Sequence, residues 1–267
     1  MFGKLLKYDF RSMWKQFAFI WPAALALALI NRFTISGLDS SNVVGEIASG
    51  LAMFVYVAIL VAMFIIVTIF TILRFYKGLL GDEGYLMHTL PVKTWQLIGS
   101  KLLCAVVTTT ASVVVAVLSI LLVVPFGLHD LQEFIHALKY LFSGWTGETV
   151  HVIIALLELV LLMLISFAAG YLQLYLAMSI GHLFNKNRVI MSVVGYIGIN
   201  TALNLIGSIC MVIIGTNSRP IVGFFNSLQV FTLVHSFLWG MILVELILSA
   251  VFFFGTEYIL RKRLNLE

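Results

Sequence analysis

The chain has 267 residues, of which 61% are hydrophobic and only 10% are charged, and its formal net charge is +4. Soluble domains are about half apolar and about one quarter charged, so this composition excludes an ordinary soluble protein and predicts an all-α, polytopic membrane protein. The basic residues are spread over short connections instead of forming one patch, which excludes a nucleic-acid-binding surface.

Residues 1–16 are predicted to form a basic amphipathic helix that lies in the membrane interface. Its apolar residues recur at helical spacing, and four cations lie off their stripe: Lys4, Lys7, Arg11 and Lys15. Such a helix places its lysines toward anionic headgroups. A secretory signal peptide is the alternative interpretation, but its charged region would be too long and too amphipathic.

Six apolar stretches follow within residues 17–260, each near or above the roughly 20 residues that a helix needs to cross a bilayer. They are Phe17–Ile35, Ile47–Leu73, Leu102–Pro125, Val150–Ile180, Val189–Gly215 and Gln229–Leu260. Several are longer than a bilayer is thick, so these helices must tilt, kink or extend beyond it. In the fourth stretch, small residues four positions apart predict close helix approach: Ser166 with Gly170, and Ala177 with Gly181.

The distribution of the 16 Lys and Arg residues predicts the orientation of these helices. Thirteen of them belong to one side of the membrane. They lie before the first stretch, in the connection 74–101, after the fourth stretch and in the tail 261–267. The other side has only Arg32, near the end of the first stretch, with Lys139 and Arg219. The positive-inside rule therefore predicts that both termini are cytoplasmic, and it leaves the amphipathic segment 126–149 outside.

Two acids stand deep within the apolar stretches, Glu158 in the fourth and Glu245 in the sixth. Ionisable residues at such depth are costly and mark a pathway or a partner contact. His151 is seven residues before Glu158, hence on the same helix face, and His235 is ten residues before Glu245. Two interpretations remain open, namely a proton relay and glutamates that hydrogen-bond at an interface between helices or subunits.

Other chemical motifs are few. Asn200 and Asn204, one turn apart in the fifth stretch, either hydrogen-bond across helices or line a polar path. The sequence has no G-x-x-x-x-G-K-[ST], H-E-x-x-H, G-x-S-x-G or paired-cysteine motif, so we expect no catalytic residues, no metal site and no cofactor bound by this chain. Cys104 and Cys210 fall in apolar stretches and are expected to be inert thiols.

The densest group of specific residues is Gly81–Pro91, in the connection 74–101. Asp82 and Glu83 favour the start of a short helix and Pro91 ends it. This helix would present an aromatic and apolar tip, made of Tyr85, Leu86 and Met87. Thr94 is then predicted to cap a second helix. A short cytosolic helix of this kind suits a groove on a partner protein; the alternative is a loop lying on lipid.

Several of these features together resemble the permease subunit of type-2 ATP-binding-cassette (ABC) exporters, in a branch common in Firmicutes. The matching features are the opening Lys4–Arg11, the stretch Gly81–Pro91 with the following Ser100–Leu102, the six spans and the ending Leu260–Glu267. The resemblance implies an N-terminal elbow helix in residues 1–16, a location in the bacterial cell membrane and a coupling helix that docks on a separate ATPase. It assigns this coupling role to Asp82, Glu83, Tyr85, Leu86, Met87 and Leu90.

By this resemblance, two ATPase subunits that bind ATP and Mg²⁺ would drive two permease chains, identical or paralogous, embedded in membrane lipids. This chain would not itself be an enzyme, and the cargo would be a peptide or a lipophilic compound. The short connection Thr216–Leu228 departs from family members that carry an external helical element there. The alternative functions are a proton-coupled secondary transporter that uses Glu158 and Glu245, and a membrane scaffold.

Overall fold

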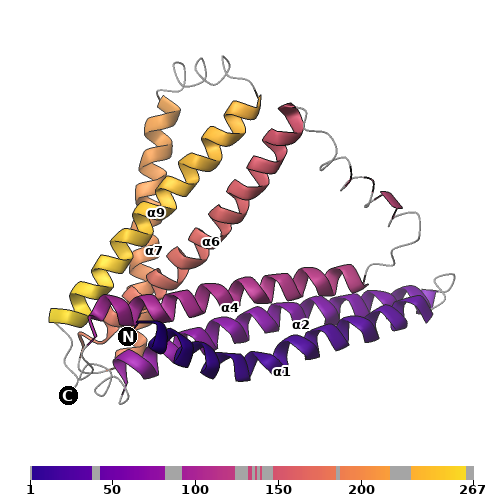
Figure 1. Ribbon diagram of the computed structural model, residues 1–267, viewed down its shortest axis with the longest axis horizontal. Helices are drawn as coiled ribbons and strands as arrows, with labels where there is room; N and C mark the ends of the chain where they lie inside the picture. Colours follow the sequence, from indigo (N-terminus) through magenta and orange to yellow (C-terminus); the bar gives the residue numbers. More distant parts are fainter. Residues whose placement is uncertain are drawn as a thin grey trace. The chain divides into compact units, whose positions relative to one another are not determined.

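The computed structural model describes residues 2–37, 43–81, 92–123, 132–133, 136, 139, 147–184, 187–216 and 230–262. Its elements are α1 (Phe2–Gly37), α2 (Val43–Phe75), the π-helix η1 (Tyr76–Leu80), α4 (Thr94–Val123), α6 (Gly147–Gly181), α7 (Arg188–Thr216) and α9 (Val230–Lys262), drawn in Figure 1. No strand occurs in this part of the chain. The predicted all-helical fold class is confirmed.

In the described part of the chain, six helices are long and apolar enough to cross a membrane, as predicted. The segments that qualify are Phe17–Thr34, Val43–Leu80, Thr94–Val123, Val150–Gly181, Arg188–Ile213 and Val230–Lys262. Within the chain, no residue of the segment in α7 is buried. Apolar surface of this extent requires lipid or another protein chain to cover it, which agrees with a multi-pass membrane protein.

The described chain forms two compact units. The first comprises residues 1–74 and 103–144, and therefore holds α1, α2 and most of α4. The second comprises residues 75–102 and 145–267, and holds η1, the start of α4, and the helices α6, α7 and α9. Each unit has its own packed interior and is described separately.

In the first unit, α1, α2 and α4 lie side by side (Figure 1) and meet in small apolar clusters. One cluster consists of Met13, Phe17, Val67 and Cys104. Hydrogen bonds between side chains join the helices as well. The indole Nε1–H of Trp21 donates to Ser112 Oγ at 3.0 Å, and the hydroxyl oxygens of Tyr56 and Ser119 are 2.8 Å apart. These polar contacts fix the register of α4 against α1 and α2.

Helix α1 continues without a break from Phe2 to Gly37. The basic amphipathic segment 2–16 and the candidate span Phe17–Thr34 therefore belong to one helix. A separate elbow helix is not confirmed. Pro22 lies inside α1, where a proline removes a backbone hydrogen bond and bends the helix. Figure 1 shows that α1 changes direction along its length.

In the second unit, α6 packs against both α7 and α9. Its last residue, Gly181, approaches the start of α7 closely. A Cβ atom at Gly181 would lie 2.5 Å from the backbone nitrogen of Ser192 and 2.7 Å from the carbonyl oxygen of Arg188. Gly170, on the same helix, would meet no heavy atom within 4 Å. The close approach predicted from small residues therefore occurs at Gly181, whereas Gly170 lies in open space within the described chain.

We expect Gly181→Ala to destabilise the chain, because backbone atoms of α7 must move to admit the methyl group. Overpacking of this kind costs about 1–3 kcal/mol. Gly170→Ala is the matched control, and we expect it to be neutral or stabilising, since alanine is favoured over glycine in a helix by about 1 kcal/mol. The measurement is the thermal unfolding midpoint in detergent. Equal midpoints for the two variants would contradict the close approach.

Candidate functional site: a buried glutamate and a packed loop base

Glu158 is a buried acid on α6, with only 8% of its side chain exposed. It lies eight residues beyond Val150, where the candidate span begins, which is about 12 Å along the helix axis. A carboxylate at this depth is costly unless charged or polar partners surround it. The partners of Glu158 therefore decide what this residue can do.

Both carboxylate oxygens of Glu158 are held by α9. His235 Nδ1 lies 2.8 Å from Oε2, forming an ion pair if the histidine is protonated, and Trp239 Nε1–H donates to Oε1 at 2.8 Å. His235 and Trp239 are four residues apart, so one face of α9 presents both donors. These bonds fix the register between α6 and α9 within the second unit.

His151 extends the cluster toward the surface of the unit. Its Nδ1 lies 3.3 Å from Nε2 of His235, and its ring stacks on Phe231 with centroids 5.0 Å apart and planes 15° from parallel. His151 is exposed, whereas Glu158 is buried. The predicted common face of His151 and Glu158 is confirmed, since both residues contact His235. We call His151, His235 and Glu158 the relay cluster.

The relay cluster has the connectivity for proton transfer. With neutral imidazoles, His151 Nδ1–H can donate to His235 Nε2, and His235 Nδ1–H can donate to Glu158 Oε2. A proton accepted at Nε2 of His151 can then displace one proton along each hydrogen bond. The end state is a neutral carboxylic acid at Glu158 and two neutral imidazoles with exchanged tautomers.

The sequence associated His235 with Glu245, and the structure pairs it with Glu158 instead. Ten residues fall about 80° short of three full helical turns, so His235 and Glu245 do not share a face of α9. Glu245 is half-buried and has no hydrogen bond or ion pair with other described residues. Within the described ranges, no group of His, Cys, Asp and Glu could hold a metal ion.

Asn200 and Asn204 do not join α7 to another helix in the described chain. The amide of Asn200 donates to the carbonyl oxygen of Tyr196 at 3.1 Å, and the amide of Asn204 donates to the carbonyl oxygen of Asn200 at 2.9 Å. Each asparagine thus satisfies its amide on its own helix. No residue of the candidate span in α7 is buried within the described chain.

The predicted coupling residues lie outside the described residues: Asp82, Glu83, Tyr85, Leu86, Met87 and Leu90. Most of the external segment 126–149 lies outside them as well. The structure does describe the two ends of the loop, residues 75–81 and 92–102, which we call the loop base. All of the loop base belongs to the second unit.

The loop base is tightly packed on the end of α6. The ring of Phe75 stacks on that of Tyr175, with centroids 3.8 Å apart and planes 6° from parallel, and both side chains are fully buried. Tyr76 meets His182 edge-on at 5.2 Å. The N–H of Gly81 donates to the carbonyl oxygen of Tyr76 at 2.8 Å, which closes the π-helix. Such π-helical turns often occur at functional sites.

The sequence ended the second apolar stretch at Leu73, whereas helical structure continues to Leu80. Arg74 and Lys77 gave this segment the composition of a loop. The neighbouring apolar pair Leu79 and Leu80, both buried, was the signal that it is packed. The second helix begins at Thr94, the residue that was predicted to cap it.

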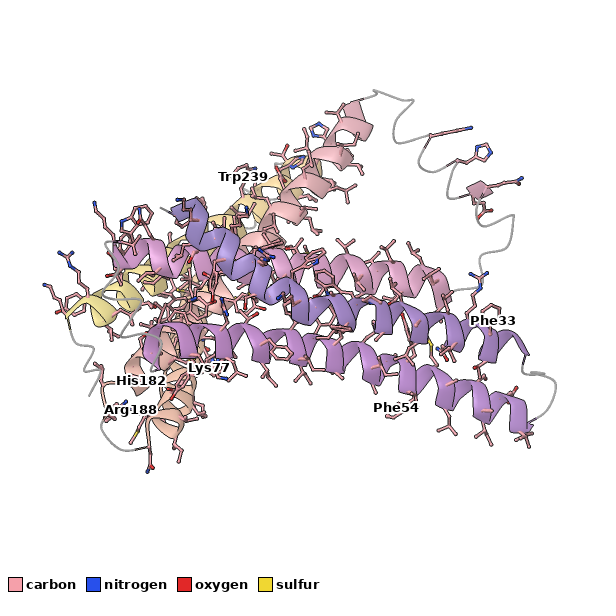
Figure 2. The ribbon with its side chains drawn as sticks, turned by 60° about the horizontal axis from the view of Figure 1, so that its bottom comes forward. Phe33, Phe54, Lys77, His182, Arg188 and Trp239 are labelled. Carbon is pink, nitrogen blue, oxygen red and sulfur yellow. The ribbon has the colours of Figure 1, made fainter. Side chains whose placement is uncertain are left out.

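His182 follows the last residue of the candidate span and is buried against Tyr76. Burial has the largest effect and lowers the pKa of its imidazole; a hydrogen bond to the Met178 carbonyl raises this pKa in part, and the positive charge of Arg188, the smallest of the three effects, lowers it. Its Nε2 is buried without a hydrogen-bond partner among the described residues. Figure 2 shows Lys77, His182 and Arg188 near one end of the second unit, well away from Trp239.

This lowered pKa predicts a pH dependence of stability. The unfolded chain, in which the histidine pKa is about 6.5, binds a proton more readily than the folded chain, so stability falls as the pH drops below that value. The contribution is fully present above this pH. We expect the unfolding midpoint of the wild type to fall more between pH 7.5 and 5.5 than that of His182→Gln. An equal fall in both proteins would contradict this role.

Two parts of the second unit thus hold chemically specific contacts, namely the relay cluster and the loop base. They share helix α6, which carries Glu158 near one end and Tyr175 near the other. Comparisons of this chain with protein-family models, with curated proteins and with solved structures found no match.

Proposed function

We propose that this chain is the transmembrane permease subunit of an ATP-driven ABC exporter, and that residues 82–91 attach a separate ATPase to it. The resemblance of Lys4–Arg11, Gly81–Pro91 and Leu260–Glu267 to such permeases supports this proposal, together with the six apolar helices. The observation that carries it is the loop base, because a loop that transmits force needs a rigid mounting.

The contacts of the loop base lead to one helix. Phe75 on Tyr175 and Tyr76 on His182 join the start of the loop to the end of α6. The other end of the loop is held by buried residues of α4, among them Leu97 and Ile98. Close-packed elements transmit displacement instead of absorbing it. A partner that displaced residues 82–91 would therefore move α6.

In this proposal the chain supplies the translocation pathway and the attachment, while ATP and Mg²⁺ bind to the partner ATPase. Two ATPase subunits would act on two permease chains, identical or paralogous. Closure of the ATPase pair would shift the permease between two states that differ in their affinity for it. The apolar surface of the helices favours a peptide or a lipophilic compound as cargo.

The first test looks for an ABC ATPase gene next to the gene of this chain, co-expresses the two products and measures whether they co-purify. We expect the wild-type chain to retain the ATPase through affinity purification, and Leu86→Asp with Met87→Asp to lose it. Placing charges in an apolar contact leaves them desolvated and unpaired, and loss of interface anchors costs 2 kcal/mol or more, about 30-fold in affinity.

The matched control is Leu183→Asp with Phe184→Asp. These two apolar residues are adjacent and exposed, and they follow α6 on the side of the chain that also carries the loop. We expect this variant to retain the ATPase. Full retention by the loop variant, or equal loss by both variants, would overturn the proposed attachment.

The second candidate function is a proton-coupled transporter, and the relay cluster is the observation that favours it. The cluster links exposed His151 to buried Glu158 by two hydrogen bonds. A transporter of this kind would work on a proton gradient without ATP and would stop in Glu158→Gln. Transport would persist in Glu245→Gln, because Glu245 is outside the relay cluster. Export that persists in Glu158→Gln and requires ATP would exclude this candidate.

A further inference from the structure

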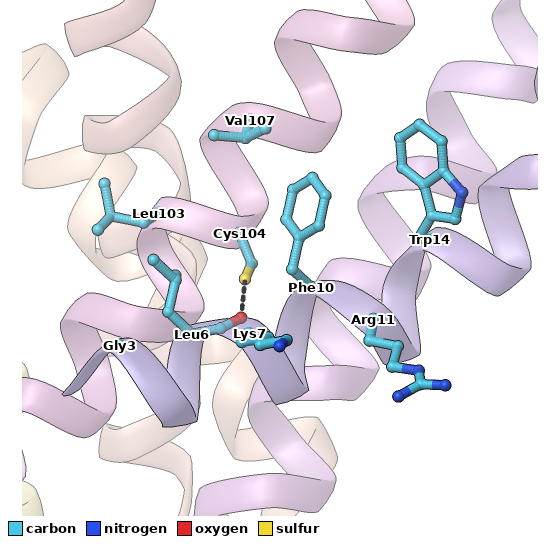
Figure 3. A pocket seen from close by; sticks show the side chains of 9 residues that line it. All are labelled: Gly3, Leu6, Lys7, Phe10, Arg11, Trp14, Leu103, Cys104 and Val107. Carbon is cyan, nitrogen blue, oxygen red and sulfur yellow. Dashed lines mark hydrogen bonds between the residues drawn. The ribbon is translucent and has the colours of Figure 1, made fainter. Parts of the chain in front are cut away.

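The first unit contains an open apolar groove of about 640 Å³ between the beginning of α1 and helix α4. Its walls are formed by Leu6 and Phe10 from α1 and by Leu103 and Val107 from α4. Figure 3 shows these side chains around Cys104, whose thiol contacts the carbonyl oxygen of Leu6 at 4.0 Å. A volume of this size is within the range of sites that bind small ligands.

Two cations also line the groove. Lys7 and Arg11 are one helical turn apart on α1, so they stand on the same face. Both are exposed, and neither has an ion pair with another described residue. Among the described residues, none of those that line the groove is acidic. In Figure 3 the guanidinium of Arg11 points away from the rings of Phe10 and Trp14.

The groove also lies at a defined place along the first helix. Its α1 residues end at Trp14, three residues before Phe17, where the candidate span begins. Tryptophan at the end of a span is typical of the headgroup region of a bilayer. The groove is therefore expected at headgroup depth, with its apolar walls continuing toward the acyl chains.

We propose that this groove binds an anionic phospholipid, with one acyl chain against the apolar walls and the phosphate between Lys7 and Arg11. Arginine offers a planar fork of donors to phosphate, and lysine adds a flexible positive charge. The aliphatic stem of Lys7 can cover apolar surface while its ammonium group reaches the headgroup. Charge complementarity selects an anionic lipid over a zwitterionic one of the same chain length. This site is independent of the proposed ATPase attachment.

The experiment titrates the purified full-length chain in mild detergent with dioleoylphosphatidylglycerol and counts bound lipids by native mass spectrometry. Dioleoylphosphatidylcholine, which has the same acyl chains, is the comparison. We expect selective retention of the phosphatidylglycerol. Lys7→Gln with Arg11→Gln should weaken its binding by about 30-fold, because each cation near an anionic headgroup contributes about a factor of five. Val107→Trp, which narrows the groove, should weaken the binding of both lipids.

The control for charge is Lys4→Gln with Lys15→Gln, which removes two exposed cations from the same helix but outside the groove. This variant should bind phosphatidylglycerol as the wild type does. Three results would overturn the proposal: equal binding of the two lipids by the wild type, equal loss of binding in the two charge variants, and no binding at all. The first two mean that lipid coats the helix without a specific site.

Discussion

Replacing His235 by leucine is expected to lower the thermal unfolding midpoint in detergent by about 6–12 °C. The substitution leaves the buried carboxylate of Glu158 with Trp239 as its remaining described partner. A buried carboxylate that loses one of its hydrogen-bond donors is left partly unsatisfied, at a cost of about 3 kcal/mol, and the unfolding midpoint of a chain of this size shifts by about 2–4 °C for each kcal/mol. The lost stability includes the cost of leaving the buried Glu158 carboxylate with one partner fewer, in addition to the contact itself.

A double-mutant cycle separates this effect from a general loss of packing. Glu158→Leu with His235→Leu removes both partners and places apolar side chains between α6 and α9. We expect the double variant to be more stable than His235→Leu alone, because no unpaired acid is left behind. Additive losses in the two single variants would contradict a coupled pair.

Replacing Arg74 by leucine is expected to lower the free energy of unfolding by an amount similar to that for His235→Leu. The contact that is lost lies in the first unit. Arg74 Nη2 lies 2.9 Å from Oδ1 of Asp9, whose side chain is only 1% exposed, and Arg74 Nη1 donates to Ser12 Oγ at 2.9 Å. The guanidinium therefore ties the start of α1 to the end of α2. Its removal takes the positive charge from a buried carboxylate, for which we expect a loss of about 3 kcal/mol.

The control is Lys77→Leu, three residues further along the chain. Lys77 is exposed and has no ion pair with a described residue, so this substitution removes the same charge without breaking a contact. We expect the unfolding midpoint of Lys77→Leu to stay within a few degrees of the wild type. If the two variants unfolded at the same temperature, the Asp9–Arg74 pair would not be what holds these helices together.

The six spans could be predicted from the sequence because each is a continuous apolar run. The expected stretch Val150–Ile180 and the observed segment Val150–Gly181 differ by one residue. Apolar length alone determines such a span, whatever packs against it. The same signal could not show that residues 2–16 continue into the first span as one helix, since a basic amphipathic segment is compatible with a separate helix and with a continuous one.

The partners of Glu158 could not be predicted from spacing along one helix, because they depend on how α6 and α9 pack. The information was present as two matching polar faces. His151 and Glu158 are seven residues apart on α6, and His235 and Trp239 are four apart on α9. When two apolar helices each carry one polar face, the polar groups find hydrogen-bond partners if the two faces pack against each other. These two polar faces pair His235 with Glu158, and they do not include Glu245.

Helix α6 connects the two parts of the candidate site. Glu158 and Tyr175 are seventeen residues apart, which is about 25 Å along the helix. The relay cluster fixes one part of α6 against α9, and the loop base fixes the other part against Phe75. A force on the loop and a change of charge at Glu158 would therefore act on the same helix.

Covalent cross-linking measures most directly whether residues 82–91 contact an ATPase. A photoreactive thiol reagent attached at Met87→Cys should give an adduct with the co-expressed ATPase, at the summed mass of the two chains. The native thiols compete little, since Cys104 is buried and Cys210 lies within a candidate span. The same reagent at Phe184→Cys should give no adduct. An ATPase that is present but is never joined to position 87, or is joined equally well to position 184, would contradict the proposed attachment.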